Sequence, residues 1–180
     1  MKRRTFLAAT GAGAAGLLAL AAERRWRRAV VVTPPDHAPR ILSRAEWGTL
    51  AAAQDRLLPS GPGSPGAREV NAVGYLDGAL AEADTDPADR DRVKQGAARL
   101  DALAHDRGAT SFADLAEAAR DEALRAFQKE DDAGEWFETM LGYTLEALLG
   151  DPIHGGNPDE IGWRWAGHQP GWPRPGRSGT

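Results

Sequence analysis

The sequence contains no cysteine among its 180 residues. This absence excludes a disulfide bond, a thiolate nucleophile, a zinc site with cysteine ligands and a cysteine-held iron–sulfur cluster. It also excludes the CxxCH motif that attaches c-type haem. Cysteine usage therefore gives no information on export, which has to be judged from the N-terminal segment.

The motifs that accompany autonomous catalysis are also missing. No GxGxxG lies between a predicted strand and a helix, and there is no P-loop or HExxH motif. Neither GxSxG nor SxxK provides a context for a serine nucleophile. The acidic stretches at residues 84–91 and 130–132 lack the DxDxDG pattern of a calcium loop and are typical of helix N-termini. We therefore expect no catalytic residue, no bound cofactor and no metal site in this chain.

Basic charge is scarce after the first 28 residues. Residues 1–28 hold seven Lys/Arg and one Glu, which leaves 15 basic and 25 acidic residues, a net charge of −10, in the remainder. An acidic domain is poorly suited to neutralising phosphates. We expect no nucleic-acid partner.

The N-terminus resembles an export signal. A basic start precedes a weakly apolar Ala/Gly/Leu run of about 17 residues, which is borderline for spanning a membrane. Four residues match the twin-arginine motif, whose cargo crosses the membrane already folded: Arg3, Arg4, Phe6 and Leu7. Residues 1–28 are interpreted as a twin-arginine signal peptide or an N-terminal anchor, with an ordinary basic tail as a third alternative. Whether the leader is cleaved stays open.

The middle of the chain predicts helices. Proline-rich residues 29–41 read as a linker, and Ser43 with Glu46 has the spacing of a capping box. Apolar spacing predicts helices over about 43–58, 68–83, 86–107, 111–127 (in one piece or two) and from 130–132 to Gly150. The last of these is apolar over a wide arc, so we expect it to be the central helix of a bundle. Strand-like alternation occurs in residues 29–33 and is too isolated to found a sheet. The expected fold is an all-α domain of four to six helices over residues 42–150.

An irregular C-terminal arm follows over residues 151–180. From Gly150 to Thr180, 13 of 31 residues are Gly or Pro, and three of the six tryptophans fall in the same window. Glycine allows left-handed backbone and close approach of another chain, and proline fixes φ. Tryptophans in such a segment must bury against the chain's own helices or against a partner.

The same residues carry a family resemblance. A helix ending in Gly-Asp-Pro, followed by Gly-Gly-Asn and then Gly-Trp, resembles the gluconate 2-dehydrogenase subunit 3 family. Its members are small accessory subunits of periplasmic, flavin-dependent sugar and sugar-acid dehydrogenases, and they usually carry a twin-arginine signal. The resemblance implies a large FAD-containing subunit as partner and, in some complexes, a cytochrome subunit with haem c. It implies a periplasmic location, with membrane contact through the complex or an uncleaved leader.

The resemblance also implies a partner interface. The residues that match the family block, extended by one further tryptophan, are Asp151, His154, Gly155, Gly156, Asn157, Gly162, Trp163 and Trp165; Trp172 is a further candidate. Two interpretations of this block stay open, because Trp163 can fill a partner's pocket or the core of its own domain. A metal site using His154 and His168 is a weaker alternative.

The sequence thus predicts a non-catalytic subunit that stabilises an exported FAD-dependent dehydrogenase and escorts it through twin-arginine export. The alternatives are a stand-alone periplasmic binding or scaffold domain, and an enzyme with an unrecognised site. The substrate and the stoichiometry are not encoded in any motif.

Overall fold

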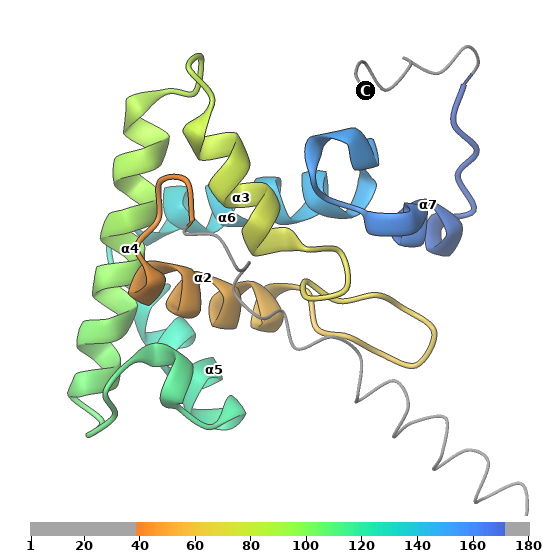
Figure 1. The fold of residues 1–180 in the computed structure, drawn as a ribbon. Helices are drawn as coiled ribbons and strands as arrows, with labels where there is room; N and C mark the ends of the chain where they lie inside the picture. The colour runs from red at the N-terminus through yellow and green to blue at the C-terminus, as the bar shows by residue number, and fades with distance from the viewer. Residues whose placement is uncertain (1–38, 172–180) are drawn as a thin grey trace, which may run out of the picture. The chain divides into compact units, whose positions relative to one another are not determined.

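The computed structural model describes residues 39–171, and in this range the chain is all-α, as predicted. The described residues form the following α-helices (Figure 1): α2 (Arg44–Leu57), α3 (Ala72–Ala81), α4 (Pro87–His105), α5 (Glu117–Phe127), α6 (Ala133–Leu149) and α7 (Ile161–Ala166). Three 3-10 turns complete the secondary structure: η1 (Phe112–Asp114), η2 (Pro152–His154) and η3 (Pro158–Glu160). No strand occurs between residues 39 and 171, where Gly61 and Ser64 form an isolated bridge. The predicted export signal and Trp172 lie outside the described residues.

Two helix starts follow from their local sequence. The Ser43 hydroxyl accepts from the Glu46 backbone at 3.2 Å, and the Glu46 carboxylate accepts from the Ser43 backbone at 2.6 Å. This reciprocal pair is the predicted capping box of α2. At α4, the Asp86 carboxylate accepts from the Ala88 backbone at 2.9 Å and Pro87 fills the first turn. The predicted capping box is confirmed, and α4 begins within one residue of the predicted position 86.

One boundary differs from the sequence prediction, and one alternative that the prediction left open is decided. The helix expected from residue 68 begins at Ala72, because Asn71 has a left-handed backbone (φ 56°) that interrupts helical geometry. The region 111–127 forms two elements, η1 and α5. Leu115 and Ala116 separate them because both have extended backbones.

The main core lies among α2, α3, α4, α5 and α6. Its largest buried side chain, Trp136 of α6, lies against Gly96 of α4. A Cβ at residue 96 would stand 1.9 Å from Trp136 Nε1, so α4 can pass this close because it has glycine there. Phe127 and Phe137 pack around the same indole, with ring centroids 5.1 and 5.0 Å away.

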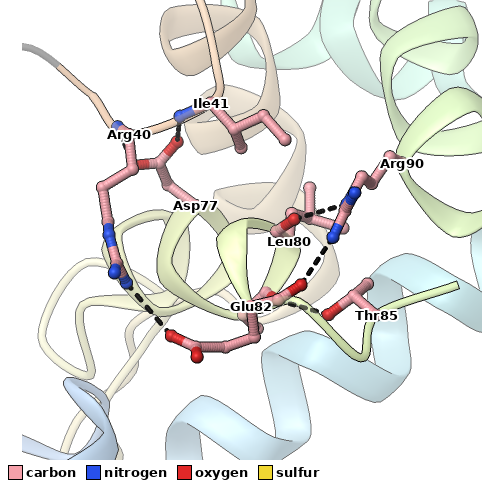
Figure 2. Close-up of polar contacts among 8 residues, drawn as sticks. Arg40, Ile41, Asp77, Leu80, Glu82, Thr85 and Arg90 are labelled. Atoms are coloured by element: carbon pink, nitrogen blue, oxygen red, sulfur yellow. Dashed lines mark hydrogen bonds and ion pairs between the residues drawn. The ribbon is translucent and has the colours of Figure 1, made fainter. Parts of the chain in front are cut away.

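A buried carboxylate fixes the end of the predicted linker. Asp77 of α3 accepts hydrogen bonds from the backbone N–H groups of Arg40 and Ile41 at 2.6 and 3.0 Å (Figure 2). It also accepts from the Leu42 N–H at 2.9 Å. The Arg40 guanidinium also pairs with Glu82 at 3.2 Å. Residues 40–42 are therefore fastened to α3, although Arg40 and Ile41 had been assigned to a linker.

Helix α6 contacts α2, α3, α4 and α7, in keeping with a central position. The wide apolar arc that suggested this position is, however, not wholly buried. Trp136, Met140 and Leu148 are inside, while Leu141 and Leu145 are 44% and 42% exposed. The other helices cover one side of α6 and leave part of the apolar arc in solvent.

Within the described residues, no helix combines the length and apolar composition needed to cross a bilayer.

Candidate functional site

The Gly/Trp-rich segment after α6 folds back onto the domain. The turn η3 contacts both η2 and α7, and α7 packs against α6. A small second core supports it, made of Ala67, Val70, Ala72, Ala147 and Leu148, with Leu58, Tyr75 and Ile161 at its edge. Between residues 152 and 166, the segment predicted as an irregular arm thus forms two 3-10 turns and the short helix α7, which are docked on their own domain.

Asn157 is the centre of this docking. Its side chain is fully buried, and its backbone is left-handed (φ 48°), which asparagine tolerates better than most residues. The amide nitrogen Nδ2 donates to the Gly150 carbonyl at 3.0 Å, and Oδ1 accepts from the Gly162 N–H at 2.7 Å. The backbone N–H donates to the Val70 carbonyl at 3.1 Å. One residue therefore connects the end of α6, the start of α7 and the segment before α3.

Two glycines of the block permit close backbone contact. A Cβ at Gly156 would lie 2.7 Å from the Ala147 Cα, and one at Gly162 would lie 1.8 Å from the Leu148 carbonyl oxygen. Both obstacles are backbone atoms of α6, which cannot rotate away as a side chain can. Glycine is required at these positions by packing within the chain.

Trp163 packs inward as well. It is 6% exposed, and its indole Nε1 donates to the Leu149 carbonyl at 2.6 Å, next to the C-terminal end of α6. The His168 ring lies edge-on to it with centroids 5.3 Å apart, and the His168 backbone N–H donates to the Trp163 carbonyl at 2.8 Å. In the described structure, the indole is therefore buried against its own chain, beside the end of α6.

The other predicted interface residues reach the surface. His154 and Gly155 are exposed, Asp151 is half-buried, and Trp165 is 50% exposed. The Asp151 carboxylate accepts from the Ile153 backbone at 3.1 Å and so caps η2. The structure therefore brings the eight predicted residues together on one segment and divides them into four buried and four accessible ones.

Two contributors were missed by sequence reasoning. The Asn71 amide donates to the Gly155 carbonyl at 2.8 Å, so a second left-handed asparagine ties the loop to the start of α3. Tyr75 donates to the Glu146 carboxylate at 3.0 Å, and burial, together with this hydrogen bond, raises the pKa of Tyr75 to about 12. The tolerance of asparagine for left-handed backbone is the one sequence signal that could have marked Asn71. Nothing local marks Tyr75.

The other stretches considered as sites are the metal-ligating side chains, the acidic residues 130–132 and the glycine-rich connector 60–66. Between residues 39 and 171, no group of three or more His, Asp or Glu side chains is placed to hold a metal ion. Glu130, in an acidic stretch considered for calcium, receives the Arg99 guanidinium at 2.6–2.9 Å. The 60–66 connector is a tight turn in which the Glu69 carboxylate accepts from Ser60 and Gly66.

The fold and the segment define a small all-α protein whose Gly-Asp-Pro, Gly-Gly-Asn and Gly-Trp elements pack together at the C-terminal end of α6. The chain belongs to the gluconate 2-dehydrogenase subunit 3 family, whose model matches residues 44–171. The match covers more than half of the chain and includes both asparagines and α7. No curated protein and no solved structure matched the chain in the corresponding comparisons.

Proposed function

We propose that this protein is the non-catalytic small subunit of an exported FAD-dependent sugar or sugar-acid dehydrogenase complex. The family match over residues 44–171 carries the proposal, since the family is that of a dehydrogenase's third subunit. The flavin and the substrate-binding residues belong, in this proposal, to the large subunit, and haem c to a cytochrome subunit where the complex has one. The small subunit stabilises the flavoprotein.

In the proposed partner interface, the four accessible residues of the segment and the four buried ones have different roles. Asp151, His154, Gly155 and Trp165 are accessible and contact the large subunit directly. Gly156, Asn157, Gly162 and Trp163 hold that surface in shape through their contacts with α6. A half-exposed tryptophan on a rigid support is a typical anchor of a protein interface.

The proposed export role rests on Arg3 and Arg4. A flavoprotein that acquires its cofactor in the cytoplasm has to be exported folded, and the twin-arginine route accepts folded cargo. The small subunit would then supply the signal for both chains, and the mature complex would reside in the periplasm.

Cell fractionation tests the proposal. In cells that make both subunits, dehydrogenase activity and flavin are expected in the periplasm or at the membrane. With this chain deleted, or with Arg3 and Arg4 replaced by lysine, both should remain in the cytoplasm. Periplasmic flavoprotein in the deletion strain would contradict the escort role, and a small subunit still exported after the double substitution would contradict the signal.

A further inference from the structure

One side of α6 presents leucines to solvent. Leu141, Leu145 and Leu149 are 44%, 42% and 48% exposed, whereas Met140, Thr144 and Leu148 beside them are buried. Residues four apart in a helix lie above one another, so the three leucines form one row. Isolated exposed leucines are ordinary, but an aligned row of three is a feature of binding surfaces. We call this row, together with Gly142, the α6 leucine face.

Gly142 has no packing role within the chain. A Cβ built there meets nothing within 4 Å in the described structure, and its φ is not left-handed. Glycine inside an exposed helix costs about 0.5–1 kcal/mol relative to alanine. Gly96 and Gly162 meet close neighbours, while Gly142 leaves a notch beside the leucines that lets another backbone come close.

The charge around the face indicates what kind of molecule covers it. Residues 133–149 contain the acidic Glu138 and Glu146 and no Lys or Arg, while the third acid, Glu135, is paired with Arg92 of α4 at 2.9 Å. The C-terminal end of a helix, near Leu149, adds partial negative charge. Two copies of α6 facing each other would bring glutamates together, and an anionic membrane would be repelled. A partner with an apolar surface edged by Lys or Arg is complementary.

We propose that the α6 leucine face is the surface on which the large subunit docks an apolar helix flanked by basic residues. This proposal rests on the proposed function and adds the location and the chemistry of the contact. The face adjoins the C-terminal end of α6, where the Gly/Trp-rich segment begins. The accessible residues Asp151 and His154 follow directly in the chain.

Binding measurements with one pair of variants test the location. Leu145→Glu places a charge in the middle of the row, and Ala98→Glu places the same charge on an exposed position of α4. The probe is the flavin-containing subunit purified from the wild-type complex and titrated onto each full-length chain. Loss of a central anchor costs at least about 2 kcal/mol, so Leu145→Glu should raise Kd about 30-fold or more. Ala98→Glu should stay within about twofold of the wild type.

Gly142→Ala gives an independent readout. The thermal midpoint of the isolated chain should rise, because the alanine favours the helix and meets no neighbour. Affinity for the flavin-containing subunit should nevertheless fall, because the methyl group fills the notch. If residue 142 had only a structural role, Gly142→Ala would raise the thermal midpoint without lowering the affinity for the flavin-containing subunit.

Failure of this proposal differs from failure of the proposed function. If the wild-type chain does not bind the flavin-containing subunit, the proposed function and the proposed docking face are both wrong. If it binds and Leu145→Glu binds equally well, the function stands and the docking face lies elsewhere. A lower melting temperature of isolated Leu145→Glu would show that the chain covers the row itself. A wild-type dimer that Leu145→Glu dissociates without loss of flavoprotein binding would assign the face to self-association. Either result overturns the proposal.

Discussion

The Asn157 side chain accepts from the Gly162 N–H at 2.7 Å and donates to the Gly150 carbonyl at 3.0 Å, inside a site with no exposure to solvent. These two contacts close the loop between α6 and α7. Alternative partners are not available at a fully buried position, so stability should depend strongly on this side chain.

Asn157→Ala is expected to lower the free energy of unfolding by about 2–5 kcal/mol, because two buried backbone groups lose their partners and alanine is strained at φ 48°. Asn157→Gly loses the same bonds without that strain, so its loss should be about 1 kcal/mol smaller. Urea unfolding of the two variants measures the difference. Equal, wild-type-like stability of both would contradict the central role of Asn157.

Two glycine-to-alanine substitutions on helices should act in opposite directions. Gly162→Ala forces a methyl group against the Leu148 carbonyl and should destabilise the chain by about 1–3 kcal/mol. Gly142→Ala meets open space and should stabilise it by about 0.5–1 kcal/mol. Calorimetric melting of the isolated chains provides the comparison. The same sign for both would show that their surroundings differ from those described.

Trp163 and Trp165 offer a second matched pair. Trp163→Ala should lower the free energy of unfolding by about 3–5 kcal/mol, because the indole is 6% exposed and its Nε1 is hydrogen-bonded to the Leu149 carbonyl. Trp165→Ala removes a half-exposed ring and should change it by no more than about 0.5 kcal/mol, while weakening capture of the flavoprotein. An unchanged melting temperature for Trp163→Ala, with loss of the complex, would instead place that indole in the interface.

Acid sensitivity should depend on Asp121. The Arg56 guanidinium, hydrogen-bonded to it at 2.7 Å, lowers the pKa of Asp121 below its usual value. A carboxylate with a lowered folded-state pKa stabilises the fold above the unfolded pKa of about 4, and this contribution disappears as pH falls through the folded value. Burial raises the pKa of Asp55, so the effect of this carboxyl on stability has the opposite dependence on pH. Stability measured between about pH 6 and pH 2.5 should fall less steeply in Asp121→Asn than in the wild type. A curve as steep as the wild-type one would contradict this assignment.

Local signals in the sequence predicted the parts of the fold that depend on neighbouring residues. The capping box of Ser43 and Glu46 joins residues three positions apart, so its spacing was sufficient for the prediction. The start of α3 was misplaced because Asn71 bonds to Gly155, 84 residues away. No local pattern contains such a contact.

The candidate site was recognised by its residues but not by their roles. Gly156 and Gly162 could be predicted to allow close approach, yet the approaching backbone belongs to α6 of the same chain. Hydrophobic spacing marked α6 as broadly apolar and could not separate buried Met140 from exposed Leu141, because adjacent residues carry equal weight in the pattern. Deciding which side faces the core requires knowing where α2, α3 and α4 lie.

The most direct test of the account is purification of the affinity-tagged full-length chain from cells that also make its dehydrogenase partner, followed by visible absorption and mass spectrometry of the eluted complex. We predict a yellow complex that contains this chain and a larger flavin-bearing subunit and that oxidises a sugar or sugar acid. A colourless eluate containing the intact chain alone, from cells in which the flavoprotein is present, would contradict the account.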